Sequence, residues 1–309
     1  MGHVHLAALK ASDQISLAGI VEPVDDVRAN LEREHVPLFA SPQQLIDAGI
    51  AEGVLIAAPS PMHPVLVRQF AAAGIPVLCE KPIGVSPDDA ATARDAALRA
   101  GVVLQVGYWR RFVPQLRELR ARVQAGELGE IYQLSCMQWD HEPPSASFRG
   151  DSGGIAIDMG VHEIDQIRWL LGEQFEWVMA VGAGRLPPES LSAADPDAAV
   201  VLARLSGAAV ATISLGRRFP YADSCWVELW GTRGYERVPF MWDGDVWSAD
   251  SDEVFVGAMR AQAEAFARAV RGGPCEGADG DDAVTALTVA AQIAESLAGT
   301  STRVPSAVQ

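Results

Sequence analysis

The feature that most constrains the fold is the alternation of short apolar runs with helical segments over the first third of the chain. Strands are expected at Ile15–Val21, Gly53–Ala57, Pro76–Cys79 and Val102–Val106, and helices at Val24–Glu34, Pro61–Ala73 and Pro87–Ala100. Strands that are apolar throughout and separated by helices predict a parallel sheet covered on both faces. Because such crossovers are right-handed, we expect a doubly wound α/β domain of the Rossmann type.

The pattern changes after residue 111. Strand-like runs follow one another without intervening helices, at Trp177–Ala183, Ala199–Leu205, Ala209–Leu215 and Trp226–Trp230. This succession predicts an α+β domain with a large open, mainly antiparallel sheet, closed by helices at 257–271 and 281–297. We therefore expect a dinucleotide-binding domain over residues 1–111 and a substrate-binding and oligomerisation domain over residues 112–309.

Charge and composition exclude several classes of partner. The 309 residues carry a net charge of −16, and both nucleic acid and anionic membranes bind basic surfaces. No apolar run approaches the roughly 18 residues that a membrane span needs, and no secretory signal is visible. The four cysteines include no Cys-x-x-Cys pair, so we expect reduced thiols in a cytoplasmic protein without a zinc site.

The start of the chain departs from the usual Rossmann opening. A first strand followed by Gly-x-Gly-x-x-Gly is expected, and only Gly2 is present. Glu22 follows 20 residues later, close to the spacing of the carboxylate that binds the adenosine ribose. We therefore expect a dinucleotide-binding domain that lacks its first strand and the first two glycines, with impaired cofactor binding.

The first motif whose side chains could take part in catalysis is Cys79-Glu80-Lys81-Pro82, which follows an apolar strand. Open α/β sheets bind ligands at the carboxyl ends of their strands. The chain has only two lysines, Lys10 and Lys81, and an amine can lose a proton where a guanidinium cannot. The alternative is an ordinary surface turn.

The second motif places Asp158 four residues before His162, so that on a helix they share one face. A carboxylate beside an imidazole orients it and raises its proton affinity, which suits proton transfer near neutral pH. Two alternatives remain open at this point. Asp158 could cap the helix while His162 is a core residue, or the two could form a metal site with His141.

Two further segments lie at strand ends. Pro59, Ser60 and His63 form a proline-rich shelf, for which the alternative is a helix start with His63 on the surface. Arg111 lies at the junction of the two expected domains, where its guanidinium could face substrate or pair with an acidic neighbour.

Together these residues resemble the glucose–fructose oxidoreductase and inositol dehydrogenase family (Gfo/Idh/MocA) over essentially the whole chain. Gly2 and His5 look like the tail of its opening motif. The other matching segments are Ala58-Pro59-Ser60-Pro61-Met62-His63, Glu80-Lys81-Pro82, Gly107-Tyr108-Trp109-Arg110-Arg111-Phe112, and the helix with Gly154, Asp158, His162 and Asp165.

The resemblance implies hydride transfer between a nicotinamide and a ring alcohol of a cyclitol or sugar. Lys81 would hydrogen-bond the reacting oxygen, His162 would be the general base and Asp158 would orient it. The implied cofactor contacts are Gly2, Glu22, Pro59, Ser60, His63, Glu80, Lys81 and Pro82, with Arg111 and Tyr221 as weaker substrate contacts. Glu22 favours NAD over NADP, because a carboxylate repels a 2′-phosphate.

The resemblance implies no metal, and it implies a homodimer or homotetramer formed through the C-terminal sheet. The competing hypothesis is a non-catalytic sensor that binds dinucleotide and sugar on the same scaffold. Such sensors tend to lose the lysine and the histidine, and this chain has both. The loops around Trp139–Gly150 and Phe219–Ser224, which would select the substrate, carry no transferable code.

Overall fold

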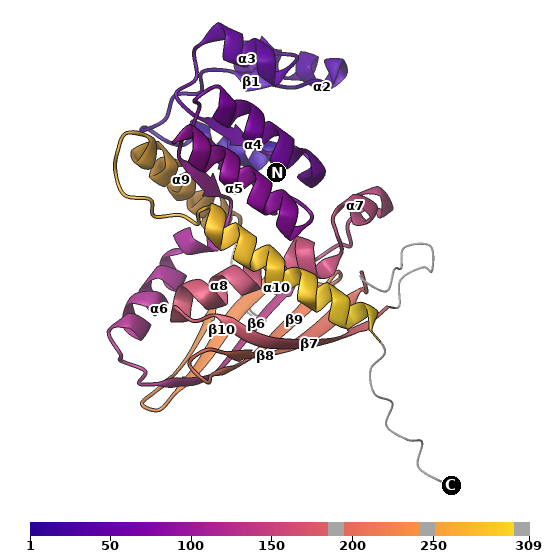
Figure 1. Ribbon diagram of the computed structural model, residues 1–309, viewed down its shortest axis with the longest axis vertical. Coiled ribbons are helices and arrows are strands. Elements are labelled where there is room, and N and C mark those ends of the chain that lie inside the picture. The colour runs from indigo at the N-terminus through magenta and orange to yellow at the C-terminus, as the bar shows by residue number, and fades with distance from the viewer. Residues whose placement is uncertain (185–194, 242–250, 300–309) are drawn as a thin grey trace. The chain divides into compact units, whose positions relative to one another are not determined.

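The computed structural model describes residues 1–184, 195–241 and 251–299 (Figure 1). It divides into two compact units, the first with residues 1–121 and 245–288 and the second with residues 122–244 and 289–309. The sequence-based boundary between residues 111 and 112 stays a prediction. The structural division differs from this boundary: it places residues 112–121 and 245–288 in the first unit.

The first unit contains short parallel strands alternating with helices. Its elements are α1 (Gly2–Lys10), β1 (Ile20–Val21), α2 (Asp25–Asn30), η1 (Glu32–Glu34), β2 (Leu38–Phe39), α3 (Pro42–Ala48), β3 (Val54–Ile56), η2 (Ser60–Met62), α4 (His63–Ala72), β4 (Val77–Cys79), α5 (Pro87–Ala100), β5 (Leu104–Val106), η3 (Trp109–Phe112), most of α6 (Pro114–Gln124) and α9 (Ser251–Val270). Strand β1 pairs with β2, and β3, β4 and β5 form a second sheet in that order; every pair is parallel. The predicted parallel α/β architecture is confirmed.

Local signals account for these helices. The Ser86 hydroxyl accepts a hydrogen bond from the backbone N–H of Asp89 and caps α5, and Gly101 ends that helix with a φ of +66°. The same pair of signals frames α3, which begins after Ser41 and ends at Gly49. Strand β2 was missed in the sequence because a two-residue strand has no measurable periodicity. Helix α3 was missed because its seven residues cover only about two helical turns.

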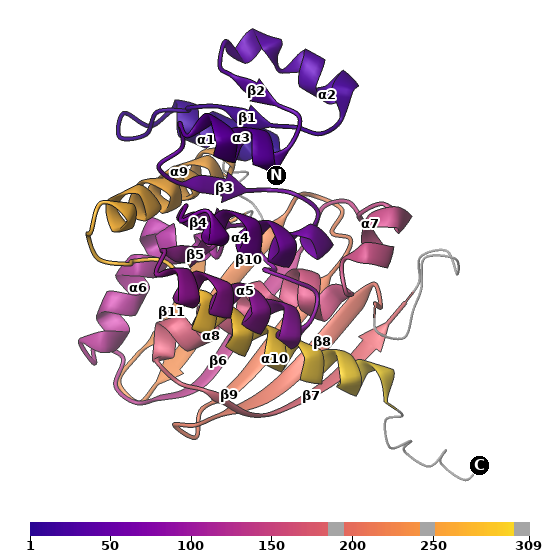
Figure 2. The same ribbon diagram turned by 45° about the horizontal axis from the view of Figure 1, so that its top comes forward.

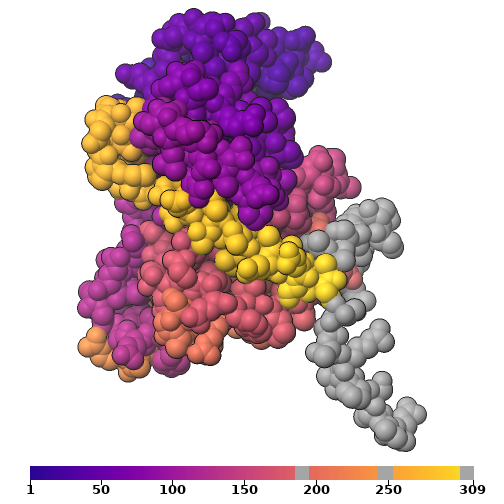
Figure 3. All heavy atoms as spheres, viewed as in Figure 1, coloured from indigo at the N-terminus to yellow at the C-terminus, as the bar shows by residue number. Residues whose placement is uncertain are grey.

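Helix α9 belongs to the core of the first unit, although the sequence grouped it with the closing helices of the second domain. Phe266 and Ala263 of α9 pack with Leu78 of β4 in one buried cluster. The ring of Phe255 meets Trp109 of η3 edge to face, with 4.8 Å between ring centroids. Figure 3 shows the golden surface of α9 directly beside the purple surface of the N-terminal third.

The second unit is built on one six-stranded sheet. Its elements are β6 (Ile131–Trp139), α7 (Ala146–Asp151), the π-helical turn η4 (Ala156–Gly160), α8 (Val161–Leu171), β7 (Phe175–Ala183), β8 (Ala198–Leu205), β9 (Val210–Gly216), β10 (Ser224–Gly231) and β11 (Tyr235–Pro239). The strand order is β11-β10-β6-β9-β8-β7. Every neighbouring pair is antiparallel except β6 and β9, so the predicted mainly antiparallel sheet is confirmed. Helix α10 (Gly280–Ala298) begins in the first unit and ends in the second.

Burial alternates along the sheet of the second unit. In β8, Ala199, Val201, Ala203 and Leu205 are buried while the residues between them are exposed. Helix α8 covers the buried face (Figure 2). The opposite face of strands β7, β8 and β9 carries exposed large apolar side chains: Trp177, Met179, Val181, Val200, Leu202 and Val210.

Among residues 1–184, 195–241 and 251–299, no helix has both the length and the apolar character that a bilayer span requires.

The packing of α4 gives a matched stability test. Val67 is fully buried, whereas Val65 on the same helix is 49% exposed. Val67→Ala is expected to lower the free energy of unfolding by about 2 kcal/mol through lost burial and the cavity left behind. Val65→Ala is expected to change it by less than about 0.5 kcal/mol. Urea denaturation of both variants measures the difference, and equal losses would contradict the assigned faces of α4.

Candidate active site

The parallel strands β3, β4 and β5 end at one edge of their sheet, and the predicted cofactor residues of the shelf and of the Glu80-Lys81-Pro82 turn follow β3 and β4 there. The segments after β3 and β4 are joined by the backbone, since the N–H of Glu80 donates to the carbonyl of Ile56 at 2.9 Å. The N–H of Gly107, after β5, donates to the carbonyl of Cys79 at 2.7 Å. A Cβ at position 107 would lie 3.0 Å from the Cα of Glu80, so this close approach favours glycine.

Glu80 is held by a buried contact to the first helix. Its Oε1 lies 2.6 Å from Nε2 of His5, and both residues are buried. Its Oε2 accepts a hydrogen bond from the backbone N–H of Lys81 at 3.0 Å. The carboxylate of Glu80 therefore fixes the backbone at Lys81, whose side chain is half-buried. The first turn of α1 is tied to the end of β4 by the same contact.

His63 connects the two loops that carry the shelf and the lysine. Its Nδ1 lies 2.7 Å from the carbonyl oxygen of Pro82, and its Nε2 lies 2.8 Å from that of Ala58. Burial lowers the pKa of His63, although the two carbonyls act in the opposite direction. The alternative of a surface histidine is wrong, because His63 is only 1% exposed. Direct contact of Pro59, Ser60 and His63 with cofactor stays a prediction.

Glu22 follows β1 directly. Its Oε1 accepts a hydrogen bond from the N–H of Val24 at 2.8 Å, and its backbone carbonyl accepts one from Nη1 of Arg28 at 2.7 Å. The sequence offered no arginine immediately beside Glu22, whereas one turn of α2 brings Arg28 to it. The charge of Arg28 is paired with Asp25.

The residues of this edge fit a dinucleotide. Helix α1 begins at Gly2 with no side-chain cap and no acidic residue in its first turn, which suits a phosphate. A Cβ at Gly2 would meet nothing within 4 Å, so the space beside it is open. Glu22 supplies acceptors for ribose hydroxyls, and Ser60 and Lys81 supply donors.

Asp158 and His162 lie in the second unit. Asp158 belongs to the π-helical turn η4 and His162 to the first turn of α8, and both are buried. A π-helical turn is wide and is frequent at functional sites. That Asp158 and His162 share one face of the helix stays a prediction. Glu163 and Asp165 are also almost fully buried.

The sheet brings Asp140 and Arg217 to the same edge. Strands β6 and β9 are parallel with Trp139 opposite Gly216, so the residues that follow them emerge side by side. The N–H of Asp140 donates to the carbonyl of Gly216 at 2.9 Å. A Cβ at Gly216 would lie 2.2 Å from the ring of Trp139, so this position requires glycine.

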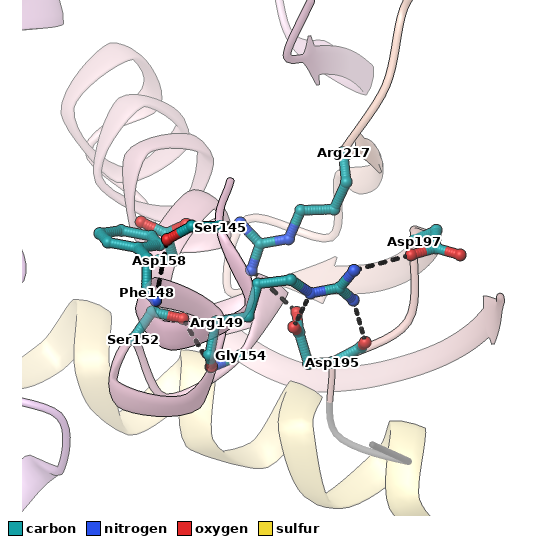
Figure 4. A network of polar contacts seen from close by, with 9 residues as sticks. All are labelled: Ser145, Phe148, Arg149, Ser152, Gly154, Asp158, Asp195, Asp197 and Arg217. Carbon is teal, nitrogen blue, oxygen red and sulfur yellow. Dashed lines mark hydrogen bonds and ion pairs between the residues drawn. The ribbon is translucent and has the colours of Figure 1, made fainter. Parts of the chain in front are cut away.

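Arg217 holds Asp158 in a buried ion network (Figure 4). Its Nη1 donates to Oδ2 of Asp158 at 2.6 Å and its Nη2 to Oδ1 of Asp195 at 2.8 Å. Arg149 of α7 donates to Asp195 and Asp197 from the other side, at 2.6 and 3.0 Å. Arg217 is 0% exposed. Burial opposes its charge, but Asp158 and Asp195 outweigh burial and raise the pKa of Arg217 above its ordinary value.

Sequence reasoning missed this network. Arg217 and Arg218 are adjacent, yet one is fully buried and the other is half exposed against Glu142. Asp195 lies 37 residues after Asp158 in the sequence, and Arg149 lies nine residues before it in a separate short helix. The only available signal is the position of Gly216-Arg217 at the end of a strand, where functional residues gather.

Asp140 has an altered proton affinity. Burial raises its pKa from 3.8 to about 6, and the nearby charges of Asp158 and Asp223 add to this. The amide of Gln138 and the guanidinium of Arg217 act in the opposite direction. Asp140 is thus an acid that titrates near neutral pH within the same cluster as Asp158.

The remaining sequence-based candidates have mixed outcomes. Arg111 forms an ion pair with Asp282 at 2.9 Å, which is one of the two roles left open for it. Tyr221 is 62% exposed and meets the ring of Phe219, and its contact with substrate stays a prediction. Within the described ranges, no group of three His, Cys, Asp or Glu side chains could hold a metal ion.

Comparison with known proteins places the chain in a family. Residues 1–108 match a model described as an oxidoreductase family with an NAD-binding Rossmann fold, and residues 116–236 match the GFO/IDH/MocA C-terminal domain. The chain belongs to the Gfo/Idh/MocA oxidoreductase family. A rhizopine catabolism protein MocA of Rhizobium meliloti is 43% identical, over 96% of this chain and 92% of that protein.

Other Gfo/Idh/MocA relatives carry dehydrogenase names. A myo-inositol 2-dehydrogenase of Thermotoga maritima is 31% identical over 76% of this chain and 71% of that protein. Among solved structures, a myo-inositol dehydrogenase from Corynebacterium glutamicum superposes with a TM-score of 0.84 at 27% identity, covering 96% of this chain and 92% of that one. This Gfo/Idh/MocA chain is an oxidoreductase, and its cofactor is NAD.

The raised pKa of Asp140 predicts a pH-dependent stability change. With a folded pKa near 6 and an unfolded pKa near 3.8, the folded state favours the protonated form. The ionised carboxylate therefore destabilises the fold increasingly as pH rises from about 4 to about 6. Asp140→Asn is expected to stabilise the protein above pH 7, by at most about 3 kcal/mol, and much less below pH 4.5.

Urea denaturation between pH 4.5 and 8 measures this effect. The exposed Asp151 provides the control, since Asp151→Asn is expected to leave the pH dependence unchanged. A stability gain for Asp140→Asn that is the same at every pH would contradict the assignment.

Proposed function

We propose that this chain is an NAD-dependent dehydrogenase that oxidises a ring alcohol of a cyclitol or related sugar. The observation that carries the proposal is the joint presence of Lys81 after β4, Asp158 in η4 and His162 at the start of α8, in a chain of an NAD-binding oxidoreductase family. The names of the relatives support the substrate class, since several are inositol dehydrogenases. A sensor without activity would need neither the lysine nor the histidine.

Lys81 is proposed to donate a hydrogen bond to the reacting oxygen of the substrate. The oxygen gains negative charge as its proton leaves, and a fixed ammonium stabilises that charge. Glu80, itself held by His5, fixes the backbone at Lys81. Arginine at position 81 would present a wider, planar group that cannot be deprotonated at accessible pH.

His162 is proposed to be the general base that accepts the hydroxyl proton, and Asp158 to orient it. An imidazole titrates near neutral pH and can accept a proton there. When bound, NAD supplies the acceptor for the hydride that leaves the carbinol carbon. Asp158 and His162 are both buried. Burial limits competition from water for the hydrogen bonds that the proposed roles of these two side chains require.

Glu22 is proposed to select NAD over NADP. Its carboxylate at the end of β1 can accept hydrogen bonds from the two ribose hydroxyls and repels a 2′-phosphate. Arg28 contacts the backbone of Glu22, but its charge is already paired with Asp25, so it does not offset that repulsion.

The role of Lys81 has a direct test. Reduction of NAD and of NADP is followed by absorbance with myo-inositol, scyllo-inositol and a set of aldoses. Lys81→Ala is expected to lower kcat by at least about 10²-fold, because one donor to the developing oxyanion is lost. Its affinity for NAD is expected to fall far less than kcat, because the other predicted cofactor contacts are unchanged.

Lys10, the only other lysine, provides the control. It lies on the surface of α1 beside Glu34, and Lys10→Ala is expected to retain activity. Full turnover by Lys81→Ala would show that Lys81 is structural, and no turnover by the unaltered chain with any polyol would overturn the proposed function.

We further propose that two copies associate through the outer face of β7, β8 and β9. Contiguous exposed apolar side chains of this kind mark association surfaces, because water contact with them is unfavourable. Three of the side chains, Trp177, Met179 and Val181, lie on β7, which is the last strand of the six-stranded sheet in the described part of the chain.

Light scattering in solution tests this association. The chain is expected to have at least twice its monomer mass of 32.9 kDa, and Leu202→Lys is expected to yield monomers because it buries a charge in the contact. Leu98 is 68% exposed on α5 in the other unit, and Leu98→Lys serves as the control. A monomeric unaltered chain at micromolar concentration would contradict the proposal.

A further inference from the structure

Packing alone does not explain why the charged side chain of Arg217 is buried. Its guanidinium is 0% exposed, and burying such a charge is costly unless acidic groups compensate it. Two carboxylates do so, from Asp158 and Asp195, at 2.6 and 2.8 Å. A well-packed apolar side chain of similar volume would often be as stable in such a place. The residue therefore calls for a role beyond stability.

The charge balance of the network indicates what that role is. Three carboxylates (Asp158, Asp195 and Asp197) are joined by two guanidiniums (Arg149 and Arg217), which leaves one negative charge (Figure 4). Asp140 and Asp223 add negative charge nearby. Without Arg217, the field at the start of α8 would be strongly negative, and an imidazole there would hold its proton tightly.

We propose that Arg217 is a positioning residue for the acid–base step: it fixes the carboxylate of Asp158 and offsets its charge, so that His162 can be neutral at the operating pH. The inference rests on the proposed function for the roles of Asp158 and His162. Arg217 does not act on substrate itself, since both of its Nη atoms are engaged by carboxylates. It sets how readily the Asp158–His162 pair releases a proton.

The network also fixes the position of Arg217 itself. Its backbone N–H donates to the carbonyl of Asp197 at 2.7 Å. Arg149 donates to Oδ2 and to the backbone carbonyl of Asp195, at 2.6 and 2.7 Å. Arg149 thus supports Asp195 without contacting Asp158, which makes it a matched control: a second buried arginine of the same network, one carboxylate farther from the histidine.

The first experiment is a titration of His162 by NMR in the chain without added cofactor, with labelled histidine and His162→Gln for assignment. Arg217→Met removes the cation and is expected to raise the midpoint by about one pH unit, which is about tenfold in proton affinity. Arg149→Met is expected to lower stability to a similar degree and to move the midpoint much less. Equal shifts for both variants, or none for Arg217→Met, would overturn the proposal.

Asp195→Asn barely changes the shape of the side chain and is expected to shift the midpoint of His162 in the opposite direction to Arg217→Met. It frees the charge of Arg217 from one of its two carboxylates, so the midpoint of His162 is expected to fall. A purely structural role for the network predicts no such reversal. This arm also decides the question if Arg217→Met does not fold, since a midpoint that rises or stays constant in Asp195→Asn would overturn the proposal.

The pH profile of kcat/KM for alcohol oxidation provides the second readout. Its acid limb is expected to move to higher pH in Arg217→Met, in parallel with the NMR midpoint, because the base must be neutral to accept a proton. Arg217→Lys keeps the charge and is expected to recover most of the shift. If the unaltered chain oxidises no polyol, the proposed function fails while the NMR titration still tests the role of Arg217.

Discussion

The ion pair between Arg217 and Asp158 is the interaction on which the second unit's polar site depends. A guanidinium that is fully removed from water must keep its carboxylates, so Arg217 links the end of β9 to the turn before α8 and to Asp195. The parallel register of β6 and β9 makes this possible, because it delivers Asp140 and Arg217 to one edge. One strand pairing and one buried charge thus organise the electrostatics around Asp158.

In the first unit, buried histidines hold the polar loops in place. The edge at which β3, β4 and β5 end is stabilised by two buried histidines. His5 contacts the carboxylate of Glu80, and His63 joins the carbonyls of Ala58 and Pro82. Both contacts restrain the loops that follow the parallel strands, and Glu80 in turn fixes the backbone of Lys81. In the role proposed for Lys81, this restraint would let the lysine act with little rearrangement.

Much of the fold could be predicted from local patterns. The parallel strands, the helix over Pro87–Ala100 and the change to successive strands after residue 111 all followed from the pattern of apolar residues. The short elements β2, α3 and α7 were missed, because they carry too few residues for a period. The sequence grouped α9 with the wrong neighbours, since an amphipathic alanine-rich helix does not encode which sheet it covers.

By itself the sequence singled out the candidate functional residues: Lys81 in its Glu-Lys-Pro turn, Asp158 and His162 four residues apart, and Glu22 after a strand. These depend on local spacing, which a chain records directly. Only the tertiary structure decided which charges compensate one another. Arg217 and Arg218 are identical neighbours in the sequence, yet the end of β9 buries the first against Asp158 and leaves the second on the surface with Glu142. Burial and pairing arise from strands that meet across long sequence separations, so the electrostatics of the site could not be read locally.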